Sequence, residues 1–314
     1  MSLTRRDFVK LCTGTVAGFG ISQMFNPEIV HALKKFVPNC FWLQGQGCTG
    51  CSVSILNSVH PSIAEVLLEA INLDFHPTIM GCEGEQAFSY MFDQAKEQAG
   101  KYVLIIEGAV PVAEDGHFCV LGEIEHKDYT MLETTIKMAK DAALVVNVGT
   151  CSAYGGIPAA KGNLTESKSV GQVLAENGVK TPVVNIPGCP PHPDWMVGTL
   201  VVAINAIEQH GLEKGLAEVV KLLDDEGRPV PFYGKNIHDN CPYLDQFDQD
   251  NYADVFTDKS KCRYELGCKG PLSNSDCFKR KWNGGVNWCV ENSVCLGCVE
   301  PGFPDEMSPF YEPC

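Results

Sequence analysis

Sixteen cysteines are the residues of this 314-residue sequence whose type and spacing could do chemistry. Eight of them lie at or beyond position 241. Two pairs, Cys48 with Cys51 and Cys295 with Cys298, have only two residues between them, a spacing that suits thiolates binding one metal centre. Thiolates are the usual ligands of iron–sulfur clusters, which transfer electrons. The cysteines therefore predict an electron-transfer protein with several clusters, in preference to a protein held together by disulfides.

A first group of four cysteines, each near a glycine, follows apolar runs typical of buried strands: Cys48, Cys51, Cys151 and Cys189. The carboxyl ends of parallel strands open on one edge of a sheet, so thiols far apart in the sequence can meet there. Cys82 follows another apolar run, at 75–80, and is a fifth candidate for the four places. The plainer interpretation is that these are reduced core cysteines, which are common in buried strands.

A second group combines an imidazole with three thiols: His238, Cys241, Cys262 and Cys268. These residues could complete a four-ligand cluster site, in which a neutral histidine reduces the negative charge and tunes the reduction potential. A structural zinc ion with the same ligands is the main competitor, because residue types alone do not separate the two.

A third group places four thiols within a short stretch: Cys277, Cys289, Cys295 and Cys298. Trp282, Trp288 and Phe303 are expected to pack around this site and to exclude water, besides filling the core. The cysteines left over are predicted to be structural thiols: Cys40, Cys82, Cys119 and Cys314. Cys12 is expected to leave with a signal peptide.

The elements that must position the first group alternate between strand and helix. Strands are predicted at 39–43, 75–80, 102–106, 144–148 and 183–186, and helices at 52–59, 86–98, 129–139 and 194–209. This pattern predicts an α/β fold with a flavodoxin-like, doubly wound parallel sheet over 33–223. At 224–314, Pro, Gly, Asn, Asp and Cys dominate, which predicts an irregular cysteine-rich cluster-binding domain that needs metal staples.

Residues 1–32 are predicted to be a twin-arginine signal peptide, which directs the protein to the periplasm. Arg5 and Arg6 precede a weakly apolar, Gly-rich stretch at 11–25 and a small-residue cleavage site at 30–32. No apolar run approaches membrane length, so no transmembrane segment is expected. The formal net charge of −15 argues against nucleic acid as a partner, because its phosphates are bound by Lys and Arg.

Longer motifs carry a resemblance to a known family. CTGC at 48–51, GTCSAYGG at 149–156, PGCPP at 187–191, HDNCPY at 238–243 and CLGCVEPGFPD at 295–305 resemble motifs of the small subunit of periplasmic nickel–iron hydrogenases. With the leader, this likeness covers nearly the whole chain. It implies the iron–sulfur subunit of a hydrogen:acceptor oxidoreductase, in which the nickel–iron site lies in a separate hydrogenase large subunit.

The resemblance also implies which cluster each group of thiols would bind. It assigns the first group to a proximal cluster without Cys82, the second group to a distal cluster, and the third group to a medial cluster. Many members of the family have Pro in place of Cys289 and a three-iron medial cluster. A thiolate at Cys289 implies a fourth iron and a lower potential, hence three 4Fe-4S clusters. In this respect the chain resembles the nickel–iron–selenium subgroup, whose selenocysteine would lie in the large subunit.

The implied function is a relay that receives electrons at the proximal cluster and releases them at the distal one, beside His238. An acidic stretch at 245–258 predicts a docking surface for a basic multihaem cytochrome c, against the default interpretation of a solvated loop. The iron–sulfur subunit of a quinone-reducing dehydrogenase is an alternative, but it lacks the two C-terminal sites. A zinc- or disulfide-stapled binding protein is another, but it does not account for the strand-end thiols.

Overall fold

The structure is a computed structural model that describes residues 37–59, 61–281 and 289–312. The predicted signal segment 1–32, with Cys12, lies outside the described residues, as do Trp282, Trp288 and Cys314. Within the described ranges, no helix is both long enough and apolar enough to cross a membrane.

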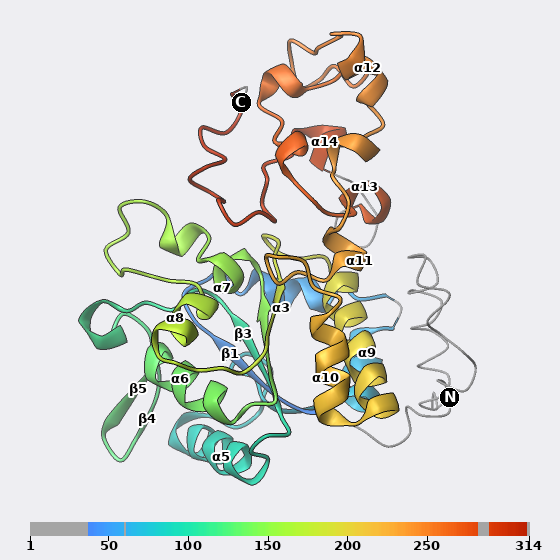
Figure 1. The fold of residues 1–314 in the computed structure, drawn as a ribbon. Helices are drawn as coiled ribbons and strands as arrows, with labels where there is room; N and C mark the ends of the chain where they lie inside the picture. The colour runs from blue at the N-terminus through green and yellow to red at the C-terminus, as the bar shows by residue number, and fades with distance from the viewer. Residues whose placement is uncertain (1–36, 60, 282–288, 313–314) are drawn as a thin grey trace.

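Five parallel strands form the central sheet: β1 (Asn39–Gln44), β2 (Asn72–Phe75), β3 (Val103–Glu107), β6 (Leu144–Val148) and β7 (Val183–Ile186). Their order across the sheet is β2-β1-β3-β6-β7. Counted along the chain as strands of this sheet alone, that is the flavodoxin-like order 2-1-3-4-5. The predicted α/β fold is therefore confirmed (Figure 1).

Helices cover both faces of the sheet, which is why its strands are almost continuously apolar. One face packs against α9 (Pro193–His210) and α10 (Leu212–Val220), with Trp42 and Ile105 in its core. The other face packs Phe41 and Leu104 against three helices: α5 (Gly84–Glu97), α6 (Met131–Asp141) and α8 (Val170–Glu176). Neighbouring residues of β1 and β3 thus alternate between the two cores.

Shorter elements complete this part of the chain: α3 (Gly50–Ile55), α4 (Ile63–Glu65), η1 (Val66–Ala70), η2 (Ala113–Gly116), β4 (Val120–Ile124), β5 (Lys127–Thr130), α7 (Thr150–Tyr154) and η3 (Ile157–Ala159). Of these, α3 and α7 directly follow β1 and β6 at the carboxyl edge of the sheet. They carry two of the first group of cysteines, Cys51 and Cys151.

The C-terminal part of the chain contains only short elements: α11 (Val230–Tyr233), η4 (His238–Asn240), α12 (Leu244–Asp248), η5 (Tyr264–Leu266), η6 (Gly270–Leu272), α13 (Cys277–Arg280) and α14 (Cys289–Asn292). Its small core contains Ile237, Val290 and Cys295. Two polar contacts join it to α9. Trp195 Nε1 donates to Asp276 Oδ1 at 2.7 Å, and Arg280 Nη1 lies 2.7 Å from Asp194 Oδ2.

Some element boundaries differ from those predicted. The strand predicted at 75–80 is β2, which ends at Phe75, because Pro77 has no N–H for a sheet and His76 turns inward. The helix predicted at 52–59 is α3, which ends at Ile55. Beyond this end, Ser58 Oγ donates a hydrogen bond to the carbonyl oxygen of Pro61. The helix predicted from 129 begins at Met131, because the residues before it form β5. The β4–β5 hairpin and α10 were not predicted.

Candidate cluster-binding sites

The first group of thiols meets at the carboxyl edge of the sheet, as its strand-end positions predict. Cys48 lies in the loop just before α3, Cys51 lies in the first turn of α3, Cys151 lies in α7, and Cys189 follows β7. Burial, the carboxylate of Glu107 and the other three thiols all raise the pKa of Cys51. The four thiols therefore lie within reach of one another's charge at this edge of the sheet.

Glycine makes room for this group of thiols. Gly149 has φ +95°, a backbone conformation that favours glycine. A Cβ atom at this position would lie 2.5 Å from Cys51 Sγ, and one at Gly156 would lie 3.2 Å from Cys151 Sγ. The backbone thus approaches the sulfur atoms more closely than any side chain would allow, which fits a thiolate-bound cluster held by the main chain.

Glu107 lies beneath the start of α3 and was not among the predicted site residues. Its carboxylate is buried and accepts hydrogen bonds from Cys51 N at 2.9 Å and from Trp42 Nε1 at 3.2 Å. It also accepts from the hydroxyl of Ser52. A carboxylate at the end of the apolar run of β3 was the one available signal in the sequence.

Cys82, the fifth candidate, lies apart from these four thiols. It packs against the core on the face of the sheet that carries α5, whereas Cys51 packs against the opposite core. Cys119 shares the core of Cys82, and burial raises its pKa. Cys40 is fully buried in β1 and its thiol lies 3.7 Å from the carbonyl oxygen of Pro38.

The second group of residues lines one small cavity in the C-terminal part: His238, Cys241, Cys262 and Cys268. Burial raises the pKa of Cys241 to about 11, and the charges of Cys268 and Cys262 add to this effect. The half-buried ring of His238 packs edge-on against Phe247, with 4.4 Å between ring centroids. His238 and Cys241, from one segment, thus converge with Cys262 and Cys268 on the same space.

The third group also comes together. Burial raises the pKa of Cys277, and the charges of Cys298 and Cys289 add to it. Buried Cys295 interacts in the same way with Cys268, Cys298 and Cys277. Cys268 belongs to the second group, so the second and third groups are neighbours.

Thr150 joins the first group of thiols to the third. Its hydroxyl accepts a hydrogen bond from Gly188 N at 2.9 Å and donates to the carbonyl oxygen of Cys298 at 2.5 Å. Burial raises the pKa of the Cys298 thiol to about 12. The hydroxyl of Thr150 thus bridges two groups of thiols that lie far apart in the sequence.

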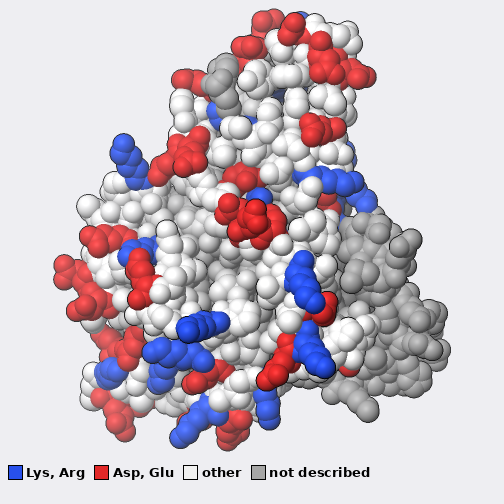
Figure 2. All heavy atoms as spheres, in the orientation of Figure 1, with Lys and Arg blue, Asp and Glu red and all other residues white. Residues whose placement is uncertain are grey.

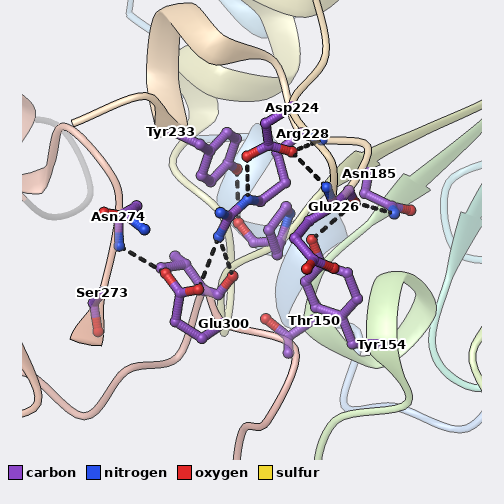
Figure 3. A network of polar contacts seen from close by, with 12 residues as sticks. Thr150, Tyr154, Asn185, Asp224, Glu226, Arg228, Tyr233, Ser273, Asn274 and Glu300 are labelled. Atoms are coloured by element: carbon purple, nitrogen blue, oxygen red, sulfur yellow. Dashed lines mark hydrogen bonds and ion pairs between the residues drawn. The ribbon is translucent and has the colours of Figure 1, made fainter. Parts of the chain in front are cut away.

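A buried ion-pair network reinforces this junction (Figure 3). Arg228 lies between two carboxylates, with its Nε 2.8 Å from Asp224 Oδ2 and its Nη1 3.1 Å from Glu300 Oε2. Glu300 Oε1 in turn accepts a hydrogen bond from Asn274 N at 2.6 Å. The network therefore connects the loop after α10 to the segment that directly follows Cys298.

The donor set can be compared with what a single metal ion needs. In the described ranges, no three side chains of His, Cys, Asp and Glu lie close enough together to hold one metal ion. All fourteen described cysteines are free thiols. Thiolates around a cluster are held apart by its iron and sulfide atoms, and buried thiols of raised pKa become thiolates when they bind a metal.

Two family models match this chain. Residues 48–203 match the one described as NADH ubiquinone oxidoreductase, 20 Kd subunit, and residues 233–311 match the one for the C-terminal part of the NiFe/NiFeSe hydrogenase small subunit. The first description suits the quinone-reducing alternative considered above. The second matches the region that this alternative lacks.

Full-length relatives agree with the second family model. The chain is 54% identical to the periplasmic [NiFeSe] hydrogenase small subunit of Desulfomicrobium baculatum, over 99% of each protein. It is 40% identical to the periplasmic [NiFe] hydrogenase small subunit of Solidesulfovibrio fructosivorans, over 99% of this chain and 93% of that one. The solved structure of the recombinant [NiFeSe] hydrogenase from Desulfovibrio vulgaris Hildenborough matches with a TM-score of 0.88 and 61% identity, covering 89% of this chain and 99% of that chain.

A parallel α/β sheet followed by a cysteine-rich region is thus the fold of a hydrogenase small subunit. The chain belongs to the NiFe/NiFeSe hydrogenase small-subunit family. Its identity to the selenium-type relative is higher than to the nickel–iron relative, in line with the resemblance noted from Cys289.

Proposed function

We propose that the chain is the electron-transfer subunit of a periplasmic hydrogenase and relays electrons between the nickel–iron site of a large subunit and an external acceptor. One observation carries the proposal: the three groups of thiols form a continuous series. The first meets the third where Thr150, next to Cys151, donates to the carbonyl oxygen of Cys298. The third meets the second where the backbone N–H of Lys269, next to Cys268, donates to the carbonyl oxygen of Cys295 at 2.8 Å. A row of redox groups in this arrangement suits a relay.

Each group would hold one 4Fe-4S cluster. The proximal ligands are Cys48, Cys51, Cys151 and Cys189; the distal ligands are His238, Cys241, Cys262 and Cys268; the medial ligands are Cys277, Cys289, Cys295 and Cys298. When bound, such clusters accept and release electrons at potentials set by ligands, hydrogen bonds and exposure. We assign the proximal site to 33–223 and the other two sites to 224–314.

The protein supplies the surroundings of these sites. Ser275 Oγ donates a hydrogen bond to Cys277 Sγ at 3.0 Å. Hydrogen bonds to a thiolate favour the reduced form of a cluster, so this bond should raise the medial potential. The thiolate of Cys289 acts in the opposite direction, because it adds negative charge.

The electron acceptor that fits the surface is a basic multihaem cytochrome c. Figure 2 shows acidic side chains gathered over the end of the molecule that carries α12. They include the exposed Asp245, Asp248, Asp250 and Asp254, in the loop between distal ligands Cys241 and Cys262. A basic partner would be steered to the distal site by this charge.

Residues 1–32 would be a twin-arginine signal peptide, a route that exports folded proteins. The periplasmic location is supported by the names of the relatives from Desulfomicrobium baculatum and Solidesulfovibrio fructosivorans. A large subunit with a selenocysteine at its nickel–iron site is the partner that the [NiFeSe] relatives favour.

Iron and zinc content test the proposal. The heterodimer would be purified without oxygen, and iron in the large subunit would be subtracted using that subunit alone. We expect about twelve iron atoms per small subunit, the number for three four-iron clusters, and no stoichiometric zinc. About four iron atoms together with zinc would leave only the proximal cluster and would make the C-terminal part a structural zinc module.

A further inference from the structure

Arg263 is a buried arginine in the cavity of the proposed distal site. Its side chain is 1% exposed, the least of any large side chain that carries a charge in the described residues. It directly follows Cys262 and lines the same cavity as His238, Cys241 and Cys268. Arginine is almost never fully buried without a partner, so the guanidinium needs an explanation.

The described residues supply only part of the hydrogen bonding that the guanidinium of Arg263 can make. Arg263 Nη1 donates to the carbonyl oxygen of Val290, and the guanidinium lies 5.6 Å from the ring centroid of Tyr243. Nε and Nη2 are buried and have no hydrogen-bond partner in the described part of the chain. No carboxylate pairs with this cation there, whereas the similarly buried Arg228 pairs with both Asp224 and Glu300.

We propose that the missing partner of Arg263 is the anionic cluster of the distal site, so that Arg263 is an electrostatic residue that favours the reduced cluster. This proposal rests on the function proposed above. Guanidinium N–H groups in a cavity with low polarity are strong donors to anionic sulfur, and their charge is weakly screened there. On reduction the cluster gains one electron, and the guanidinium stabilises the negative charge that this electron adds.

The position of Arg263 determines the direction of electron movement that its charge would favour. Val290, which it bonds, directly follows the medial ligand Cys289 in α14, while Arg263 itself adjoins the distal ligand Cys262. The extra thiolate of Cys289 lowers the medial potential, and the guanidinium in the distal cavity raises the distal potential. Both charges therefore favour electron movement from the medial to the distal site.

The test compares two cations that flank Cys262 in the sequence. Arg263→Gln removes the buried charge but keeps a hydrogen-bonding side chain, and Lys261→Gln removes a cation that is 34% exposed. Both variants would be studied in the complete heterodimer by a redox titration of the distal cluster, followed by electron paramagnetic resonance. Arg263→Gln should lower the ratio of reduced to oxidised distal cluster at least tenfold at a fixed potential, a shift of about 59 mV for one electron.

Lys261→Gln should change that ratio much less, because water screens its charge. Arg263→Lys keeps the charge and should keep the ratio near that of the unaltered protein. Equal ratios in Arg263→Gln and the unaltered protein would overturn the proposal. If Arg263→Gln loses the distal cluster, the Arg263→Lys variant decides the question. A distal cluster that is retained in Arg263→Lys with an unchanged potential supports the role of the charge. Loss of the cluster in Arg263→Lys, or a lowered potential, overturns the proposal.

Failure of the proposed function would look different. The unaltered heterodimer would then lack a distal cluster signal and would contain fewer than about twelve iron atoms per small subunit. That result would also disprove the role proposed for Arg263, before any variant was made.

Discussion

At the scale of single residues, Cys289 is the residue that would distinguish a four-iron medial cluster from a three-iron one. It begins α14, and its charge acts on Cys277 and Cys298, the thiols that would bind the other iron atoms. A fourth thiolate allows a fourth iron and adds negative charge, which lowers the potential.

Replacing this thiol tests its role. Cys289→Pro should convert the medial cluster to a three-iron form and raise its potential, because one thiolate is lost. Iron analysis should show about one iron atom fewer per heterodimer, and electron paramagnetic resonance should show the signal of an oxidised three-iron cluster. Cys119→Ala is the control, since Cys119 lies in the core away from the sites. An unchanged medial cluster in Cys289→Pro would show that Cys289 is not a ligand.

At the scale of elements, α9 is positioned by the loop that carries Cys189. His192 caps its first turn: Nδ1 accepts a hydrogen bond from Asp194 N at 3.1 Å, and Pro193 occupies the first helical position. Burial lowers the pKa of His192 to about 4, with Asp194 opposing this shift and Arg280 adding to it. The folded protein therefore holds this imidazole neutral.

This capping predicts a pH dependence of stability. The unfolded chain binds a proton at His192 near pH 6.5 but the folded chain only near pH 4, so stability is lost as the pH falls through this window. The loss between pH 7 and pH 5 should be about 2 kcal/mol. His192→Asn keeps a capping side chain that does not titrate. Its unfolding temperature in the heterodimer should fall less over that pH range, and parallel curves for both proteins would contradict the prediction.

Elements differ in how well the sequence predicts them. The strands buried on both faces, β3 and β6, were predicted within a residue or two because their apolar runs are continuous. The edge strand β2 was misplaced because it is half-exposed and contains Asn72 and Asp74. The mostly exposed β4–β5 hairpin has only a short apolar run at 118–121, and charged residues dominate the rest of it, so neither strand was predicted.

The sequence likewise predicted only part of each site. Cysteine spacing predicted three groups of ligands, and the structure brings each group together. Glu107, Thr150 and Arg263 were not predicted, because their importance comes from burial and from partners distant in the sequence. Topology alone left Cys82 as a rival; the family resemblance excluded it, and in the structure it packs against the core opposite to that of Cys51.

At the scale of the whole molecule, charge is unevenly distributed. The net charge is −15, and the end that carries α12 bears a concentration of acidic side chains (Figure 2). The proposed distal site lies at this end and the proximal site lies on the sheet edge. Acceptor and large subunit would therefore meet different parts of the chain.

Charge reversal tests the acidic surface. The double variant Asp245→Lys, Asp248→Lys changes two exposed residues of α12 and leaves Asp250 in place, because Asp250 has φ +53° and accepts a hydrogen bond from Tyr252. We expect the second-order rate of reduction of a basic multihaem cytochrome c to fall at least tenfold at low salt, with a weaker salt dependence.

The control makes the same change of charge elsewhere, with Glu123→Lys and Asp128→Lys on the β4–β5 hairpin, at the other end of the molecule (Figure 1). This variant should keep most of the rate. If both double variants behave like the unaltered protein, the acidic surface is a solvated loop and not a docking site.

The bond from Thr150 to Cys298 also has a consequence for the order of assembly. One wall of the sheet-edge site is built from residues near the end of the chain, Cys298 and Glu300, which close on Thr150 and Arg228. During synthesis the sheet can form before this wall exists, so the first group of thiols stays open to delivery of iron and sulfide. Synthesis of residues 298–300 would then close that edge, and a chain truncated before Cys298 would leave it open.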